Sequence, residues 1–532
     1  MYLDLCLFMM PYNYRLFVTD RNRGTEKDYR IYNNKATIAI KRAASGLKSG
    51  LTPPTRPWFA LTTADDDLAE YLPVKEWLDK VTKMIAKVLA SSNSYNAIDS
   101  MYEELLTFGT AASIIQDDFS DVIYLHYMTA GEYFIAQDHK RRVDTIYRYY
   151  QMTVAQVVKN WGIDNVSDRT RQLYERGMLD YWLDVTHSIE PREDRDPGVI
   201  GSHNHAWRSA YWENANMNQN SHLLSDKGYR RFPGLVTRWD VLGGDVYGHS
   251  AAMNALSDAK SLQGYEFGLN KAFDIQADPA LLIDTTFIDR EANLHPGSRT
   301  YFSSQTTESP LVRSVYEDVR LDPEGWMKLQ ERCEQRIEQA LYNDVFFMLA
   351  NLNDTNMTAT EVSRRYEEKL MMLGPVVDRQ KSELCKPLVE SIFFRLAEAN
   401  LLPDAPPEMQ GHELDLKFSS ILMQALQQSG VTSLDQFTSR IGEVAKFKPD
   451  VMDNIDFDKM INEYAKELQV PPDILVAGDQ LILIRKQKEQ AQQAAQQSQL
   501  LNQNADTYSK IGQLSTEPGT VAGALAKRVG VH

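Results

Sequence analysis

The sequence has 532 residues, 43% of them hydrophobic, and 57 basic against 73 acidic side chains give a net charge of -16. A chain of this length can bury a large core and predicts more than one domain. The acidic balance excludes tight, sequence-independent binding of nucleic acid over a wide surface, because such binding needs Lys and Arg to neutralise phosphates. It does not exclude a protein that surrounds nucleic acid.

The cysteines and the apolar segments indicate the cellular compartment of the protein. Cys6, Cys333 and Cys385 are an odd, scattered set, which argues against a disulfide framework and favours a reducing compartment. The apolar segment at residues 1–10 is short and carries Asp4 where a signal peptide has Lys or Arg. No other run is long enough to span a bilayer. The sequence therefore predicts a soluble intracellular chain without a membrane partner.

The first part of the chain mixes helical and strand patterns. Apolar residues recur with a helical period at 30–50, 72–90 and 95–108, and a short strand or anchor is expected at 57–61. The period then changes to two at 113–116, 122–127, 133–136 and 143–149, which predicts an antiparallel meander. A helix at 153–161 and strands at 182–189, 205–212 and 235–239 are expected next. Residues 30–244 therefore read as one α+β domain.

Two long helices and an extended excursion occupy the middle of the chain. Small and apolar residues line one side of a helix that begins near Ser250 and stops at Asp278-Pro279. The second helix begins at Asp322-Pro323, an N-cap followed by proline at the first helical position. Each helix is expected to be roughly 35 Å long, enough for the wall of a channel.

The second long helix carries three separate stripes. The apolar stripe is Trp326, Leu329, Cys333, Ile337 and Ala340, the basic stripe is Lys328, Arg332 and Arg336, and the acidic stripe is Glu331, Glu334 and Glu338. A helix that lies on a core needs one apolar and one solvated face, so opposite charges on two sides suit a helix with a like neighbour on each flank. A ring supplies such neighbours. An ordinary solvated helical hairpin with mixed surface charge remains the alternative.

A polar break follows at 351–358, and a capping pattern at Thr358 and Glu361 starts another long helix with an expected kink at Gly374-Pro375. Residues 403–407 form a boundary rich in proline. Shorter helical patterns lie at 421–429, 434–445 and 460–468, and a polar tail rich in Gln and Ala occupies 483–503.

Signals for catalysis, a metal or a cofactor are poor. The run GLKSG at 46–50 has Leu47 where a phosphate-binding loop needs glycine, and no strand precedes it. His203 and His205 have no Cys or carboxylate cluster nearby in sequence. Asp65, Asp66 and Asp67, and the pair Asp117 and Asp118, read as solvated turns, and Tyr147, Tyr149 and Tyr150 as sheet residues. We expect no catalytic residues, no metal and no cofactor.

Several short motifs, in order along the chain, carry a resemblance. They are RAASGLKSGLTP at 42–53, WF at 58–59, SSN at 91–93, FGTA at 108–111, YR at 147–148, MT at 152–153, MTATEV at 357–362, LGPV at 373–376 and PDVMDNID at 449–456. Together they resemble the head-to-tail connecting, or portal, proteins of short-tailed bacteriophages, the podoviruses. The resemblance covers residues 30–485, and each motif is weak alone.

The resemblance implies an α+β, predominantly helical portal fold that assembles as a dodecameric ring at one capsid vertex. It divides the chain into a wing at 1–249, a first stem helix at 250–275, a clip at 276–320 and a second stem helix at 321–345. A channel loop at 346–358, a long kinked wing helix at 359–400, a crown at 401–484 and a polar tail at 485–532 complete the expected order.

The same resemblance implies partners and sites. The ring is expected to meet the terminase large subunit, tail adaptor and tail tube proteins, and the major capsid and scaffolding proteins, in a virion assembled in the bacterial cytoplasm. Double-stranded DNA is expected to pass without sequence preference. We assign the channel loop to Asn351, Asn353, Asp354, Thr355 and Asn356, the clip to Phe287, Tyr301 and Phe302, and the inter-subunit stem contacts to the basic and acidic stripes.

The channel-loop residues are short, polar and uncharged apart from one Asp, so they offer hydrogen bonds to a duplex without a cation to hold phosphate. A plain loop between helices is the alternative reading of this segment. For the whole chain, a nucleic-acid-processing hydrolase using the His203 region, or an internal scaffolding or capsid shell protein, are the alternative functions.

Overall fold

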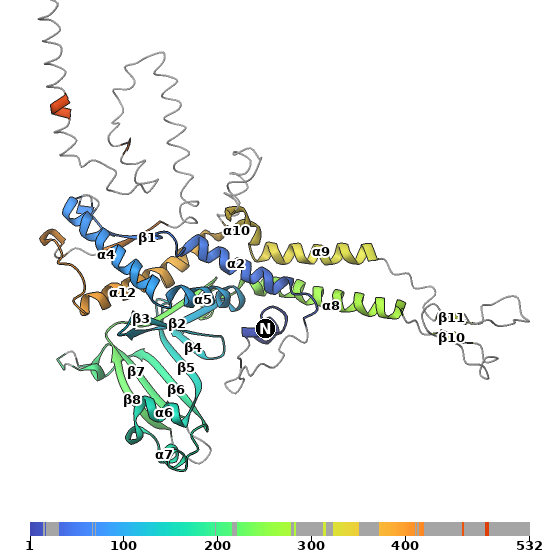
Figure 1. Ribbon diagram of the computed structural model, residues 1–532, viewed down its shortest axis with the longest axis horizontal. Helices are drawn as coiled ribbons and strands as arrows, with labels where there is room; N and C mark the ends of the chain where they lie inside the picture. Colours follow the sequence, from blue (N-terminus) through green and yellow to red (C-terminus); the bar gives the residue numbers. More distant parts are fainter. Residues whose placement is uncertain are drawn as a thin grey trace, which may run out of the picture. The chain divides into compact units, whose positions relative to one another are not determined.

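The computed structural model describes residues 1–13, 16, 31–65, 68–69, 71–196, 198–199, 201–214, 221–277, 281–283, 312–314, 323–350, 372–409, 411, 414–419, 460–461 and 485–488. The chain divides into two compact units, Met1–Gly430 and Val431–His532. The helices and strands below all lie in the first unit, which mixes helices and sheets as the sequence predicts (Figure 1).

Helices from distant parts of the chain surround the largest core. Their bounds are α1 Tyr2–Phe8, α2 Lys35–Leu51, α4 Leu72–Ser91, α5 Ser94–Phe108 and α12 Lys386–Glu398. Helix α5 lies inside this core because it carries apolar side chains on more than one face. Ile98, Leu105 and Leu106 are all fully buried. The N-terminal segment is also part of the core, since Leu5, in α1, is fully buried.

A three-stranded antiparallel sheet follows α5. Its order is β3-β2-β9, with bounds β2 Thr110–Asp118, β3 Val122–Met128 and β9 Gly234–Arg238. Gly109 ends α5 in the left-handed conformation with a φ of 80°, which suits glycine. The central strand β2 is buried on both faces because helices cover one side and the second sheet covers the other.

The second sheet has five antiparallel strands in the order β4-β5-β6-β7-β8. The strands are β4 Tyr133–Gln137, β5 Val143–Thr153, β6 Trp182–Pro191, β7 Trp207–Glu213 and β8 His222–Tyr229. Ala112, Ile114 and Met128 of the first sheet pack on Ile146 and Ile189 of the second. Helix α6 Val154–Trp161 packs on the same sheet, beside α7 Asp168–Glu175.

The predicted strands are confirmed, but they do not form one meander, because β2 and β3 pair in the first sheet and β4 and β5 in the second. Strand β8 and helix α7 were not predicted. Strand β8 escaped because its sequence, HLLSDKGY, does not alternate: Leu223 is exposed and Leu224 is buried. Helix α7 escaped because its sequence, DRTRQLYE, has little apolar character, although Ser167 caps it by accepting a hydrogen bond from Thr170 N.

A strand from the segment expected to form the crown returns to the first part of the chain. Strand β12 Leu414–Phe418 pairs antiparallel with β1 Phe59–Thr63. The expected boundary at residue 401 therefore does not separate a self-contained crown from the wing. Pairing between strands about 350 residues apart leaves no local signal, because either strand alone shows only a short apolar run.

The helix that precedes this strand is continuous from residue 372 through Gly374-Pro375. The irregular turn lies later, at Lys381–Cys385, where five residues form a π-turn before α12. The structure thus adds a helical distortion that the sequence did not predict. No residue type specifies a π-turn, and such turns are favoured where a side chain must reach a particular partner.

A buried carboxyl group joins the helices to the sheets. Glu104 of α5 is 2% exposed and accepts hydrogen bonds from Thr129 Oγ1 at 2.5 Å and Ala130 N at 3.2 Å. Both donors lie in the turn between β3 and β4. Burial raises the pKa of Glu104 to about 8, and the hydrogen bonds oppose this shift only in part.

Candidate functional site, the helical hairpin and its junction with the sheets

The predicted stem is a hairpin of two helices. Helix α8 Ala251–Ala277 and helix α9 Pro323–Ala340 run side by side, and β10 Leu281–Ile283 pairs antiparallel with β11 Val312–Ser314 in the stretch between them (Figure 1). Helix α8 has 27 residues and α9 has 18, which gives about 40 and 27 Å. The second helix is shorter than expected.

A tryptophan and a glycine set the approach of the two helices. Trp326 of α9 lies against Gly268 of α8, where an added Cβ would be 3.1 Å from the indole ring. The Trp326 ring also meets the Tyr265 ring edge-on at 6.2 Å. Cys333 and Ile337 of the predicted apolar stripe are buried, but Leu329 is 41% exposed. The stripe therefore covers α8 over only part of its length.

The acidic stripe of α9 faces the chain's own helix α2. Lys35 Nζ lies 2.8 Å from Glu338 and 3.4 Å from Glu334, and Arg42 lies 3.7 Å from Glu338. The hydrogen bond to Glu338 raises the pKa of Lys35. Two of the three acidic residues assigned to inter-subunit contacts thus have partners within the subunit.

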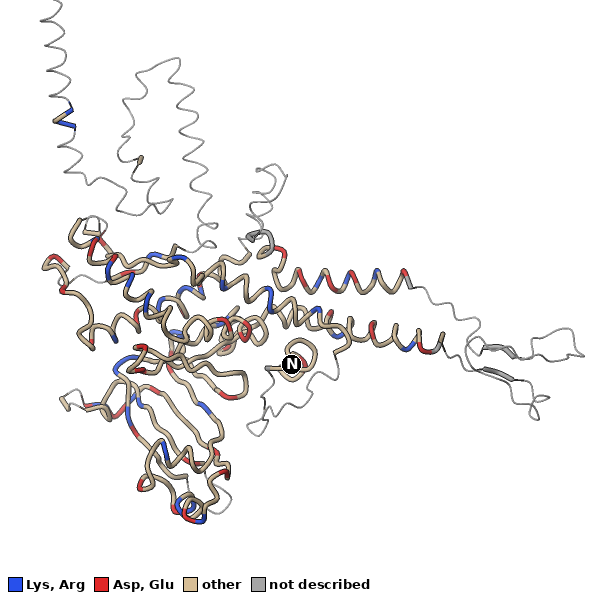
Figure 2. Tube along the Cα trace, in the orientation of Figure 1, with Lys and Arg blue, Asp and Glu red and all other residues tan. Residues whose placement is uncertain are grey.

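The basic stripe divides in a similar way. Arg336 Nη2 lies 2.7 Å from Asp258 of α8 and 3.3 Å from Cys333 Sγ. Lys328, Arg332 and Glu331 are exposed. Figure 2 shows both signs of charge alternating along α9. Arg336 is exposed as well but pairs with Asp258, which leaves Lys328, Arg332 and Glu331 as the candidates for contact with a neighbour.

The hairpin also exposes large apolar side chains. Gln263 of α8 is 4% exposed and holds the segment before α2, accepting from Tyr32 N at 2.6 Å and Asn33 N at 2.9 Å. The Tyr32 ring lies 5.2 Å from that of Phe267. Five apolar side chains here are 41–62% exposed: Tyr32, Phe267, Phe273, Met327 and Leu329. So much apolar surface on one hairpin is typical of a protein contact.

The second stem helix ends earlier than predicted. Tyr342 has a φ of 57° and separates α9 from a further helix, α10 Asn343–Ala350. The channel loop predicted to begin at Phe346 is therefore helical as far as Ala350. Sequence patterns missed this break because no glycine or proline marks it. The loop residues Asn351, Asn353, Asp354, Thr355 and Asn356 lie outside the described residues, as do Phe287, Tyr301 and Phe302 of the predicted clip.

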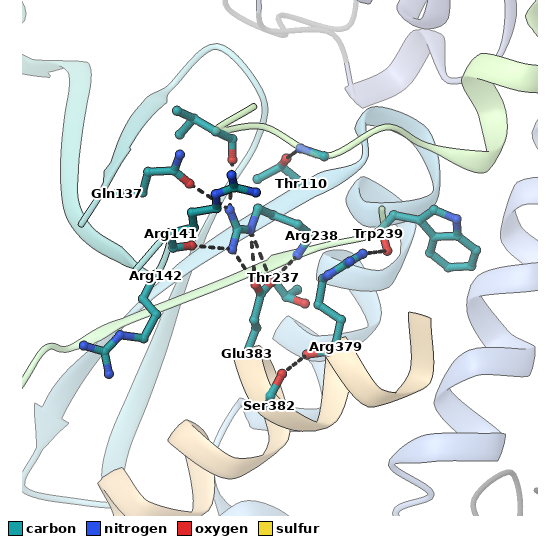
Figure 3. Close-up of polar contacts among 12 residues, drawn as sticks. Thr110, Gln137, Arg141, Arg142, Thr237, Arg238, Trp239, Arg379, Ser382 and Glu383 are labelled. Atoms are coloured by element: carbon teal, nitrogen blue, oxygen red, sulfur yellow. Dashed lines mark hydrogen bonds and ion pairs between the residues drawn. The ribbon is translucent and has the colours of Figure 1, made fainter. Parts of the chain in front are cut away.

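A buried ion pair lies where the sheets, the hairpin and the helix from residue 372 meet (Figure 3). Arg238, at the end of β9, is 5% exposed. Its Nη2 lies 2.6 Å from Glu383 Oε1, and its backbone N donates to Glu383 Oε2 at 2.9 Å. The guanidinium also donates to Arg141 O at 3.0 Å and Gln137 Oε1 at 3.3 Å. Glu383 lies in the π-turn, which aims its carboxylate at the strand.

Neighbouring residues extend this junction. Gln380 accepts a hydrogen bond from Thr237 Oγ1 at 2.6 Å and donates to Arg238 O at 3.0 Å. Arg379 donates to Trp239 O at 2.7 Å. These contacts fix one helix on the strand that leads into α8. No sequence signal points to them, because the partners lie some 140 residues apart.

The residues considered as weak catalytic signals have structural roles in the fold. The GLKSG run lies within α2, where Gly46 leaves space for the Phe346 side chain of α10. His205 Nδ1 bonds to Gly228 O at 3.0 Å, and Asp117 pairs with Arg395 at 2.6 Å. Within the described parts, no three His, Cys, Asp or Glu side chains gather closely enough for a metal ion. No helix there has the length and hydropathy needed to cross a membrane.

Comparison with known protein families identifies the family of the chain. The family model of the bacteriophage head to tail connecting protein matches residues 1–475. The chain belongs to this family. The resemblance inferred from its short motifs is thereby confirmed, and the hairpin described above is part of a connecting protein.

Curated relatives of this connecting protein cover nearly its whole length. A probable portal protein of Bordetella phage BPP-1 is 43% identical over 96% of this chain and 91% of its own length. A portal protein of Salmonella phage epsilon15 is 34% identical over 99% and 95%. A chain from the virion of a native gene transfer agent particle aligns over 83% of this chain and 95% of its own, with 12% identity and a TM-score of 0.36, which is too low to support an argument.

Proposed function

We propose that this connecting protein is a portal protein, which forms a dodecameric ring at one vertex of the phage capsid. The near full-length similarity to two phage portal proteins supports the role. The observation that supports the ring is the α8–α9 hairpin, which leaves apolar side chains and several charged residues of α9 exposed. A heterologous contact between such hairpins, repeated around an axis, closes into a ring.

The subunit contact involves the outer side of the hairpin. Lys328, Arg332 and Glu331 are exposed on α9 and carry both signs of charge, so they can pair with the next subunit. The exposed apolar residues Phe267, Phe273 and Met327 supply contact area. Glu334, Glu338 and Arg336 instead hold α2, α8 and α9 together, so they support the interface by fixing the shape of one subunit.

The ring serves as the conduit for double-stranded DNA during packaging and ejection. A net charge of -16 suits a conduit, since few phosphate contacts let a duplex slide. Residues 351–356 are proposed to face the channel, and the stretch between α8 and α9 to meet the terminase large subunit and then tail proteins. The sheet-bearing wing is proposed to meet the major capsid and scaffolding proteins.

The proposed role is structural and without catalysis, in a virion component assembled in the host cytoplasm. The hydrolase alternative gains no support from the His203 region, because His205 bonds a backbone carbonyl in a surface turn. Electron micrographs of the purified protein test the proposal. Closed rings with a central hole are expected, and ATPase and nuclease assays are expected to stay at background. Nuclease activity that disappears in His203→Ala with His205→Ala would contradict it.

A further inference from the structure

The junction between α9 and α10 combines two unfavourable features in adjacent residues. Tyr342 adopts the left-handed conformation, with a φ of 57°, which is rare for a bulky residue other than glycine. Asn343 is 8% exposed, and within the described parts of the chain neither its Nδ2 nor its Oδ1 has a hydrogen-bond partner. Strain and an unpaired buried amide both raise the free energy of this conformation.

The left-handed backbone at Tyr342 interrupts what would otherwise be one continuous helix of α9 and α10. Leu341 N bonds to Ile337 O at 3.1 Å and Tyr342 N to Gln339 O at 3.1 Å, which ends α9. Tyr342 O then accepts from Phe346 N at 3.3 Å, which starts α10. In a continuous helix, with Tyr342 in the right-handed region, the amides of residues 343 and 344 would bond to the carbonyls of residues 339 and 340. That conformation would also remove the strain at Tyr342.

Packing of α10 against α2 opposes this rotation. Phe346 is 6% exposed and fills the space beside Gly46, where an added Cβ would overlap its ring. Val345 is 1% exposed, and the Tyr342 ring lies 6.1 Å from that of Trp239. These contacts exist only while the chain bends at Tyr342. The bent form is thus held by side chains and opposed by its own backbone.

We propose that Leu341–Asn343 is a hinge between a bent and a straight form of the α9–α10 helix, and that the seat of Phe346 on Gly46 selects the bent form. The hinge controls the direction in which the chain leaves α10 at Ala350. The inference concerns the conformation of a single chain, and it holds whether or not the proposed ring forms.

A pulsed electron paramagnetic resonance distance tests the hinge in the full-length chain. Spin labels replace Gln335 and Ala350 in a background where the three native cysteines are changed to alanine. Gly46→Ala should lengthen the main distance toward the roughly 22 Å between the two backbone positions of a straight helix. Gly264→Ala, whose added Cβ has nothing within 4 Å, is the matched control and should leave the distance unchanged.

A second variant separates the hinge from a general loss of folding. Tyr342→Gly should keep the short distance, because glycine adopts positive φ without strain, although the variant also loses the ring contact with Trp239. Combined with Gly46→Ala, it should restore part of the bent population. An unchanged distance in Gly46→Ala, or a lengthened distance in Tyr342→Gly alone, would overturn the proposal.

Discussion

Charged side chains are buried and paired at the Arg238 junction, whereas on the outer face of the hairpin they are exposed to solvent. Arg238 is buried, and its guanidinium is held by Glu383 and by oxygens of Gln137, Arg141 and Val246. Lys328 and Arg332 of α9 are exposed. The first arrangement fixes one subunit internally, whereas the second leaves charge available to another subunit.

This difference separates folding from assembly. A buried ion pair whose partner is removed leaves an uncompensated charge, which destabilises the fold. An exposed charge contributes little to folding but can select a partner and its orientation. Substitutions at the junction should therefore change the stability of the chain, and substitutions on the outer face of the hairpin should change only its association.

The largest effect is expected at the junction. Glu383→Gln leaves Arg238 buried without a carboxylate and should lower the free energy of unfolding by about 3–5 kcal/mol in urea titrations. Lys35→Met removes a partly exposed pair with Glu338 and should cost less than about 1 kcal/mol. Equal losses in the two variants would show that burial does not distinguish these pairs.

A pH effect is expected from the core that joins helices and sheets. The pKa of Glu104 is raised from 4.5 to about 8 in the folded chain, so the neutral form is favoured there. Its contribution to stability is fully present below pH 4.5 and is lost as the pH rises to 8, by a few kcal/mol in total. Glu104→Gln should flatten this decline in urea titrations between pH 5 and about 8. An undiminished slope would assign it to other groups.

A smaller effect is expected inside the hairpin. Gly268→Ala places a Cβ 3.1 Å from the Trp326 ring, so the ring must move by a few tenths of an ångström, at a cost of about 1 kcal/mol. Gly264→Ala on the same helix meets nothing within 4 Å and should stabilise by up to about 1 kcal/mol. Thermal unfolding of the pair, side by side, measures the difference. Identical midpoints would mean that Trp326 does not limit the approach of α8 and α9.

The smallest effect on folding is expected at the outer face. Lys328→Glu with Arg332→Glu should change the free energy of unfolding by less than about 0.5 kcal/mol, because both side chains are exposed. The same double variant should lose higher-order association in light scattering at moderate salt. Retained association would exclude these two residues from the subunit contact.

Local patterns predicted much of this fold, and distant contacts explain what they missed. The individual strands of both sheets, most of the helices and the hairpin follow from periodicity, because each depends on residues close in sequence. The division of the predicted meander between two sheets does not. The pairing of β12 with β1, the bond between Arg238 and Glu383, and the partners of Glu334 and Glu338 join segments far apart. Three stripes on α9 indicated neighbours on both sides, but one of those neighbours is the chain's own α2.

Electron microscopy of the purified chain at micromolar concentration and moderate salt tests the central proposal most directly. The account predicts closed rings of constant copy number with a central hole, formed by the wild type and by Lys35→Met, and absent in Lys328→Glu with Arg332→Glu. Monomers alone in the wild-type sample would contradict it.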